Sequence, residues 1–223
     1  MSAADRSLDL AEISRQVGNC RLCKLGEHAR AVPGEGSPNA SVLFVGEAPG
    51  FYEDQQGRPF VGPAGQLLDE MLKVAGLARK DVYITNVIKH RPPGNRDPEP
   101  DEIEACEGYL RAQIAAIQPQ VIVTLGRYSM ARFFPNIRSM AEAHGRAMAY
   151  NGLMVYPVYH PAAALRQGRL KEVLEQDFRA LPMIIARAKE RALAPSSTRG
   201  LPGAPAQEPA TLVEAAPEQM SLW

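Results

Sequence analysis

The chain lacks several features that would assign it to a special class of protein. Its 223 residues include three cysteines and one tryptophan, and 25 basic and 25 acidic side chains cancel to a formal net charge of zero. An odd, small number of cysteines does not suggest a disulfide framework, and neutrality argues against bulk coating of a polyanion, although it allows a local basic face. No apolar run approaches a membrane span, and the N-terminus lacks a signal-peptide pattern. We therefore expect a soluble cytoplasmic monomer with no membrane partner.

Short apolar runs alternate with amphipathic segments along most of the chain. Strands are predicted at 41–45, 81–87, 121–125 and 154–158, and helices at 7–18, 64–74, 101–117, 126–134 and 170–191. Asp101 is the expected N-cap of the third helix. This alternation predicts an α/β fold with three α/β/α layers around a central, mainly parallel four-stranded sheet. We expect this domain to span residues 1–191, and residues 192–223 to form a disordered Pro- and Ala-rich tail.

The segment 46–65 joins the first predicted strand to the next helix. It carries the carboxylates Glu47, Glu53 and Asp54, and its glycines and prolines are expected to prevent regular structure. In open α/β sheets, ligands bind outside the carboxyl ends of the strands. This segment is therefore the first place to look for chemistry.

Two further strand ends present polar residues, Asn86 and His160. Each residue has an ordinary reading: Asn86 as a turn residue, His160 as a satisfied loop histidine, and Glu47 as the partner of a surface lysine. Because parallel strands end on one edge of the sheet, all three side chains are expected to converge there. That convergence favours a functional site.

These residues resemble the motifs of uracil-DNA glycosylases, most closely the iron–sulfur-containing family 4. The matching motifs are Gly46-Glu47-Ala48-Pro49-Gly50, Gly57-Arg58-Pro59-Phe60-Val61-Gly62, Thr85-Asn86 with Lys89, and His160-Pro161-Ala162. They occur in the family's order, and the resemblance runs over residues 12–188. It implies a monofunctional enzyme that flips uracil out of single- or double-stranded DNA and hydrolyses the N-glycosidic bond, leaving free uracil and an abasic site.

The resemblance also implies how the base is bound. Phe60 would stack on uracil, and Asn86 would read its Watson–Crick edge, since an amide can both donate to O4 and accept from N3–H. Gly46 and Ala48 belong to the turn whose backbone groups would hold the remaining polar atoms. Glu53 would crowd the C5 methyl of thymine, unless it is simply a solvated loop carboxylate.

The resemblance implies that catalysis requires a hydrogen-bond donor to the departing base and a group that orients water. His160 matches the donor to uracil O2, where negative charge develops. Ala48 stands where family 1 enzymes carry a water-orienting aspartate. Glu47 is therefore our first candidate for that role, and Asp54 is the second.

Family 4 resemblance further implies a [4Fe-4S] cluster on four cysteines. Cys20, Cys23 and Cys106 match three of the ligands, and His90 stands in the place of the fourth. Histidine can ligate cluster iron, so we predict a Cys₃His set that ties the first helix to the loop after the second strand. Two alternatives stay open, a Zn²⁺ ion on the same residues and a labile cluster without His90.

Basic residues flank the predicted active edge. The candidate phosphate contacts are Lys89, Arg91, Arg96, Arg166 and Arg169, any of which could also be a solvated charge. The family usually has a leucine, which wedges into the base stack, where this chain has Ala164. Leu165 or Arg166 is expected to replace it, and a weak wedge would favour single-stranded DNA.

The last five residues, Gln219–Trp223, resemble a peptide that binds the bacterial sliding clamp, although a chance match is the alternative. Two other functions compete with the enzyme. One is a module that binds or covalently traps uracil-DNA without turnover, but the chain lacks the basic histidine-bearing loop of the trapping branch. The other is an iron–sulfur protein with a decayed site, which the intact Glu47, Phe60, Asn86 and His160 argue against.

Overall fold

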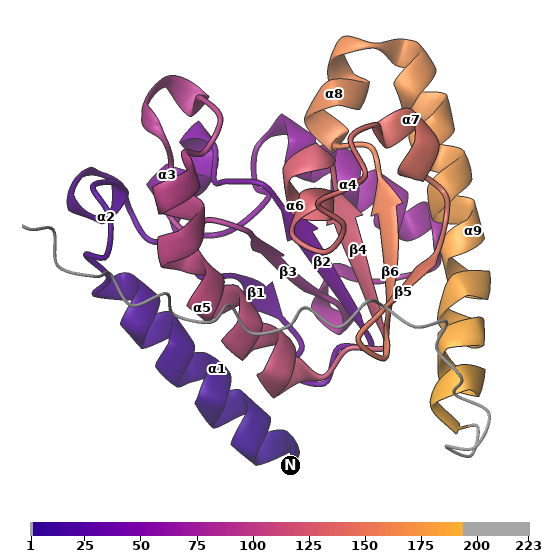
Figure 1. Cartoon of the computed structure of the whole chain (residues 1–223), viewed down its shortest axis with the longest axis horizontal. Coiled ribbons are helices and arrows are strands. Elements are labelled where there is room, and N and C mark those ends of the chain that lie inside the picture. The colour runs from indigo at the N-terminus through magenta and orange to yellow at the C-terminus, as the bar shows by residue number, and fades with distance from the viewer. Residues whose placement is uncertain (1, 194–223) are drawn as a thin grey trace, which may run out of the picture. The chain divides into compact units, whose positions relative to one another are not determined.

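A computed structural model describes residues 2–193 of the chain (Figure 1). The strands are β1 (Glu35–Gly36), β2 (Val42–Gly46), β3 (Tyr83–Asn86), β4 (Val121–Leu125), β5 (Met148–Tyr150) and β6 (Leu153–Val158). The helices are α1 (Ala3–Gly18), α2 (Leu25–His28), α3 (Phe51–Gln56), α4 (Pro63–Val74), α5 (Pro100–Ile117), α6 (Arg127–Ala131), α7 (Met140–Ala143), α8 (Pro161–Arg166) and α9 (Gly168–Leu193). Two short 3₁₀ helices, η1 (Arg79–Asp81) and η2 (Pro93–Asn95), precede β3 and α5.

The strands form one sheet in the order β1-β3-β2-β4-β6-β5. The four inner strands are parallel to one another, while β1 and β5 pair antiparallel at the two edges. The predicted α/β/α fold with a parallel four-stranded centre is confirmed. The edge strands were not predicted, because two or three residues are too few to show a period-2 pattern.

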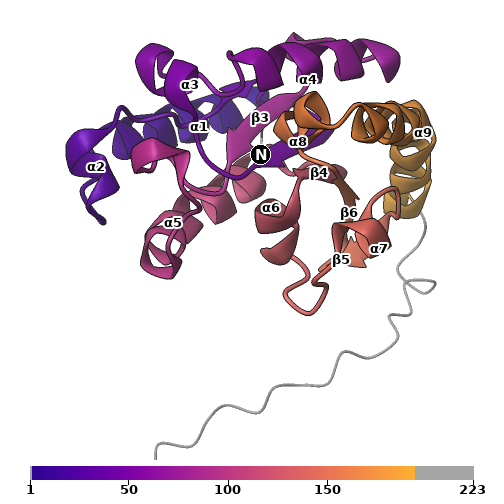
Figure 2. The same ribbon diagram turned by 90° about the horizontal axis from the view of Figure 1, so that it is seen from above.

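Each face of the sheet packs against its own helices. Along β2, Val42 and Phe44 pack with α4 and α9, whereas Leu43 and Val45 pack with α1 and α5. Successive side chains of a strand point to opposite faces, and burial on both faces explains why β2 reads as an uninterrupted apolar run. Figure 2 shows α4 on one side of the sheet and α5 and α6 on the other.

Regular structure occurs inside the 46–65 segment, contrary to the prediction. Helix α3 begins after Gly50, whose N–H donates to the Glu53 carboxylate 3.1 Å away, and ends at Gly57 in a left-handed conformation (φ 71°). The segment between Pro49 and Pro59 contains no proline to interrupt this single helical unit.

Three other predicted boundaries were inaccurate. Helix α5 is capped by Glu99 and has Pro100 as its first residue, so Asp101 lies within the first turn. Helix α6 ends at Ala131 rather than near residue 134. Helix α9 passes the predicted domain boundary at 191 and ends at Leu193. The tail peptide Gln219–Trp223 lies outside the described residues.

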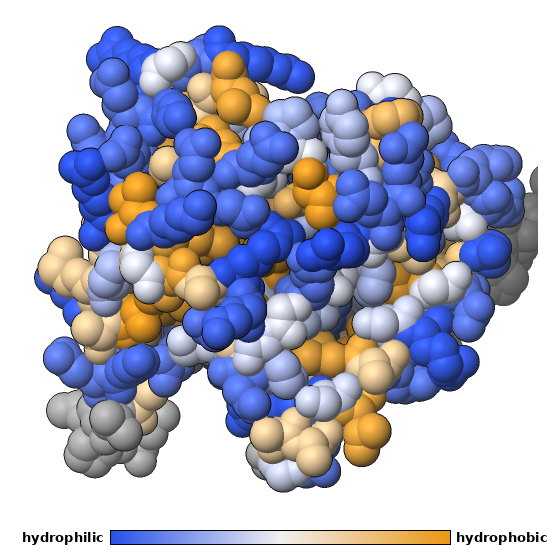
Figure 3. Space-filling model, turned by 180° about the vertical axis from the view of Figure 1, so that it is seen from behind, coloured by the Kyte–Doolittle hydropathy of each residue, from blue (hydrophilic) through white to orange (hydrophobic). Residues whose placement is uncertain are grey.

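The topology places three strand ends on one edge. The register pairs Gly46 with Asn86, and β6 ends two residues before His160. Helices α3 and α8 stand on the two sides of this edge (Figure 1). Within residues 2–193, no helix combines the length and apolar character needed to cross a membrane. Hydrophilic residues predominate on the face seen in Figure 3, with apolar residues between them.

Candidate active site

A cavity of about 380 Å³ opens at the carboxyl edge of the sheet. Its lining residues are Glu47, Ala48, Pro49, Gly50, Glu53, Phe60, Ala64, Asn86, Pro92, Asn95, Arg96, His160, Ala162, Ala163 and Arg166. Eight predicted site residues are thus brought together: Glu47, Ala48, Glu53, Phe60, Asn86, Arg96, His160 and Arg166. Six others, Gly46, Asp54, Lys89, Arg91, Leu165 and Arg169, do not line it. Asn95 and Ala163 do line it, although no motif in the sequence indicated them.

Asn86 is the most unusual polar group of the cavity. It is 1% exposed, and neither its Oδ1 nor its Nδ2 has a hydrogen-bond partner. A buried polar group without a partner costs about 1–3 kcal/mol, and such groups in native proteins are rare. Because Asn86 lines the cavity, both amide atoms are available to a molecule that enters it.

Close packing holds Phe60 beside this amide. Phe60 has a φ of 51°, which is uncommon for a bulky residue, and Gly65 permits it: a Cβ there would lie 1.9 Å from the Phe60 carbonyl oxygen. A Cβ at Gly46 would lie 2.3 Å from Asn86 Oδ1 and 2.6 Å from Phe60 Cζ. No side chain therefore fits at position 46, and Gly46 supports the cavity from beneath without lining it.

His160 faces Phe60, with 5.7 Å between the two ring centroids. It caps α8: its Nδ1 accepts the backbone N–H of Ala162 at 3.1 Å. Burial lowers the pKa of His160 to about 4, against a smaller opposing effect of Glu53. The imidazole is therefore neutral near pH 7. Since Nδ1 is an acceptor, the ring proton is on Nε2, which makes that atom a donor.

Glu47 is the carboxylate of the cavity best suited to act as a general base. Burial, followed by the charge of Asp97, raises the pKa of Glu47 to about 7, and Arg127 opposes this rise. Glu47 takes part in no ion pair within residues 2–193, so the predicted alternative of a surface lysine partner is not formed. A carboxyl that titrates near neutrality suits general-base work.

Glu53 and Asp54 have different environments, although they are neighbours in the chain. The Glu53 carboxylate accepts N–H groups from Gly50, Val61 and Gly62 at 3.1, 2.8 and 2.9 Å, and so braces the loop around the cavity. Asp54 instead accepts the Arg30 N–H at 2.8 Å. Adjacent side chains on a helix diverge by about 100°, so Asp54 points away from the cavity and the prediction that it activates water is corrected.

Lys89 is fully buried and cannot reach a phosphate, which corrects the prediction of a DNA contact. Its Nζ donates to the Asn86 carbonyl at 2.6 Å and to Thr85 Oγ1 and Gln113 Oε1, both at 2.8 Å. Burial lowers the pKa of Lys89 to about 7. We call Thr85, Lys89 and Gln113 the lysine network. It holds the backbone of the residue whose side chain faces the cavity.

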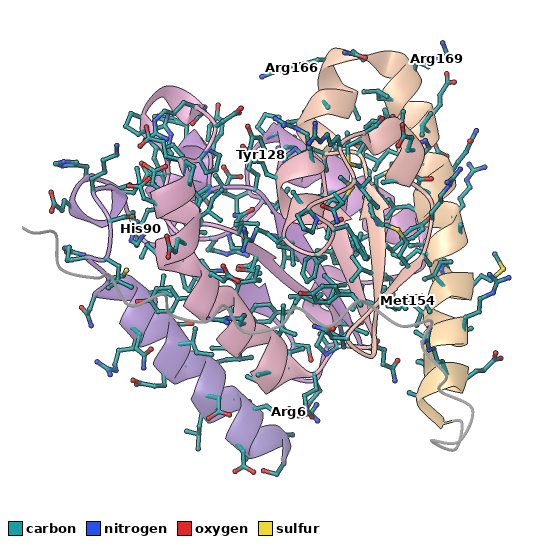
Figure 4. All side chains as sticks on the ribbon, viewed as in Figure 1. Arg6, His90, Tyr128, Met154, Arg166 and Arg169 are labelled. Carbon is teal, nitrogen blue, oxygen red and sulfur yellow. The ribbon has the colours of Figure 1, made fainter. Side chains whose placement is uncertain are left out.

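Of the remaining basic candidates, Arg96 and Arg166 line the cavity, whereas Arg91 and Arg169 do not. Arg91 Nε donates to Asn95 Oδ1 at 2.7 Å, and Arg96 pairs with Glu102 at 2.6 Å. Arg166 extends from α8 over the cavity side, whereas Arg169 points away from it (Figure 4).

The α8 rim also decides which residue can act as a wedge. Ala164 is buried and cannot be the wedge, while its neighbour Leu165 is 51% exposed. Leu165 lies outside the cavity lining but has the exposed apolar side chain that a wedge requires.

The four predicted cluster ligands lie in or near the protein interior. Cys20, Cys106 and His90 are buried and Cys23 is half-buried, and the three cysteines are free thiols. Burial raises the pKa of Cys106 to about 11 against a lowering effect of Lys89, and the nearby Cys23 and Cys20 add to the rise. His90 Nδ1 is buried without a partner.

These side chains do not form a site for a single ion. Nowhere in residues 2–193 do three His, Cys, Asp or Glu side chains converge as the ligands of one metal ion do. A four-iron cluster distributes its ligands over several irons, so its ligands need not converge on one point. The chemistry of three thiols and an unpartnered imidazole fits such a group.

Comparisons with known proteins agree with this geometry. Residues 33–181 match the uracil DNA glycosylase superfamily. The chain is 49% identical to a type-4 uracil-DNA glycosylase of Sulfurisphaera tokodaii, covering 76% of this chain and 82% of that protein. It is 46% identical to one of Archaeoglobus fulgidus, with 76% and 90% covered. A type-5 uracil-DNA glycosylase of Thermus thermophilus is 34% identical, with 52% and 59% covered.

Proposed function

The chain belongs to the uracil-DNA glycosylase superfamily, and from that premise we propose that its cavity receives a uracil flipped out of DNA and releases it by hydrolysis. It is a monofunctional glycosylase of base excision repair, as the names of its type-4 relatives indicate. The observation that carries the assignment of residues is the buried amide of Asn86, whose donor and acceptor are both unpartnered.

The donor and acceptor of that amide match the edge of uracil. Asn86 Nδ2 donates to O4, and Oδ1 accepts from N3–H. Phe60 supplies a ring face on which a flat base can stack. In this proposal Glu53 and the loop that it braces crowd a C5 methyl group and so discriminate against thymine; the bonds from Val61 and Gly62 that fix its carboxylate support this role.

Cleavage of the N1–C1′ bond leaves the electron pair on the base and positive charge on the sugar. The neutral His160 donates from Nε2 to uracil O2 and stabilises the departing anion, which requires no proton transfer at neutral pH. Water then adds to C1′ and loses a proton to Glu47, whose pKa near 7 allows it to accept one. Ala48 contributes no side-chain group to this step.

A [4Fe-4S] cluster on Cys20, Cys23, His90 and Cys106 is the second part of the proposal. The fit rests on three neighbouring thiols and the unpartnered His90 Nδ1. When bound, the group would tie the α1–α2 segment to the loop after β3, and the hydrolysis itself requires no redox step. Iron and acid-labile sulfide should be present in anaerobically purified protein, and His90→Ala should lower both while His90→Cys retains them. Stoichiometric zinc without sulfide would contradict the cluster.

DNA is the substrate and partner in this reaction, and either single or double strands could enter. Arg166 and the exposed Leu165 are the α8 groups available to contact it. From sequence alone, Gln219–Trp223 would recruit a bacterial sliding clamp in the cytoplasm. A pull-down with purified clamp, comparing the full chain with one that lacks residues 219–223, tests that recruitment.

One gel assay separates turnover from binding without turnover. An end-labelled oligonucleotide with a single uracil is incubated with the full-length protein and then treated with alkali, which cleaves abasic sites. Multiple-turnover cleavage at uracil, but not at thymine in a matched strand, is the expected result. A stable complex without an alkali-sensitive site would instead identify a binding module, and His160→Ala is the variant that controls for a contaminating glycosylase.

A further inference from the structure

Two exposed aromatic side chains stand at the α3 rim of the cavity. Phe51 is 46% exposed and Tyr52 is 49% exposed, and within residues 2–193 they are the only aromatic side chains with this degree of exposure. A single exposed apolar residue is ordinary. These two, however, occupy the first turn of α3, directly between the cavity-lining residues Gly50 and Glu53.

The ring of Phe51 is held in place although much of it is exposed. The Arg91 guanidinium lies over it, with Cζ 5.1 Å from the ring centroid, and Tyr52 makes an edge contact at 5.5 Å. Arg91 is itself fixed by its bond to Asn95 Oδ1. Cation–π and edge-to-face contacts of this kind orient a ring, so Phe51 presents a prearranged apolar surface instead of a mobile side chain.

The same rim carries basic side chains. Arg91 lines a second cavity of about 320 Å³ together with Lys24 and His28, and the one carboxylate in its lining is Asp54, 3.9 Å from the Arg91 guanidinium. Lys24 pairs with Glu99 at 2.7 Å. Both cavities share Pro92. A nucleic acid strand that leaves the first cavity past α3 therefore meets an aromatic ring followed by basic groups, which is the combination that binds single strands.

We propose that Phe51, oriented by Arg91 and Tyr52, is a stacking platform for the unpaired nucleotide next to the flipped uracil. This inference rests on the proposed function, because the neighbouring nucleotide is placed by the base in the cavity. A base in a duplex keeps its partner and its own stacking neighbours, so the platform acts mainly on single-stranded substrate. The platform is on α3, whereas the exposed Leu165 is on α8, and these two helices stand on opposite sides of the strand-end edge (Figure 1).

Binding of single-stranded oligonucleotides tests the platform. The probe carries 2′-fluoro-deoxyuridine, in which fluorine disfavours positive charge on the sugar, so that it is bound without being hydrolysed. Phe51→Ala should weaken its binding by about tenfold, since stacking of one base on an aromatic residue has about this effect. Phe51→Trp should retain the affinity. Leu8→Ala, which removes an exposed apolar side chain from α1, is the matched control and should leave it unchanged.

A second set of probes identifies the contacted nucleotide. A base-free tetrahydrofuran replaces the nucleotide on the 5′ side or the 3′ side of the uracil analogue. On the side where the base stacks on Phe51, this replacement should weaken binding by the wild type. Phe51→Ala should then bind that probe with the same affinity as the wild type. If Phe51→Ala loses the same factor with every probe, or loses nothing, the platform is contradicted. If the wild type does not distinguish the uracil probe from a thymine probe, the proposed function fails instead.

Discussion

Two buried polar groups three residues apart, one at the end of β3 and one in the loop after it, differ in their hydrogen bonding. The Asn86 amide is buried, faces the cavity and has no partner, whereas the Lys89 ammonium is buried and donates to three oxygens. Satisfied buried groups stabilise a structure, while unsatisfied ones cost stability. We infer that Lys89 serves the fold and Asn86 serves the ligand. Substitutions on the two sides should therefore separate stability from activity.

Asn86→Leu should give the largest loss of activity. Leucine has a similar size but cannot read the base edge, so kcat/KM on a uracil oligonucleotide should fall about a thousandfold, as expected when a polar pocket loses its reading group. The free energy of unfolding should stay constant or rise by about 1–3 kcal/mol, because an unsatisfied amide is removed. Urea titration alongside the gel assay measures both. A parallel loss of stability and activity would mean that Asn86, like Lys89, serves the fold and not the ligand.

His160→Ala should follow, with a loss on the order of a hundredfold or more in kcat. Since the pKa of His160 is about 4, the wild-type rate should show no inflection near pH 6.5 from this group. NMR of the imidazole through a pH titration checks the pKa. An imidazole that titrates near 6.5 would contradict the neutral-donor role.

Glu47→Gln should change the pH profile more than the affinity. The pKa of Glu47 is raised to about 7, so its basic form is lost as pH falls through 7 and the wild-type rate should fall about tenfold per unit below that value. Glutamine should lower the plateau by about tenfold and remove the inflection. Asp54→Asn, which alters a carboxylate outside the cavity, is the control and should keep the wild-type profile.

Lys89→Met should have the smallest effect on the chemical step and a clear effect on the fold. It removes the Lys89 donor from the Asn86 carbonyl and Thr85 Oγ1, and leaves Gln113 Oε1 with only the longer bond from Thr85 Oγ1 at 3.2 Å. The free energy of unfolding should therefore fall by about 1–3 kcal/mol, while kcat/KM falls less than tenfold. If kcat/KM fell strongly while the free energy of unfolding stayed unchanged, the structural role of Lys89 would be contradicted and the predicted DNA contact would be favoured.

The sequence predicted the inner sheet and the convergence of three strand ends, because buried parallel strands produce continuous apolar runs and end on one edge. It did not predict the burial of Lys89, since one of the three partners of that side chain, Gln113, comes from the distant helix α5 and is itself bonded to the Pro33 carbonyl. Asp54 was assigned to the site because the segment that forms α3 was expected to be irregular. In a helix the side chains of Glu53 and Asp54 point in different directions, and the sequence did not predict that helix. The local hydrophobic pattern of the sequence predicts strands well. It does not predict which polar side chains form hydrogen bonds with distant segments.

Competition by free bases tests most directly whether the unpaired amide of Asn86 reads uracil. Uracil and 3-methyluracil differ at N3, where the methyl group removes the hydrogen that Asn86 Oδ1 would accept. Uracil should inhibit cleavage of the oligonucleotide competitively, with 3-methyluracil at least about tenfold weaker, and Asn86→Leu should lose most of this difference in its residual activity. Equal inhibition of the wild type by the two bases would contradict the account.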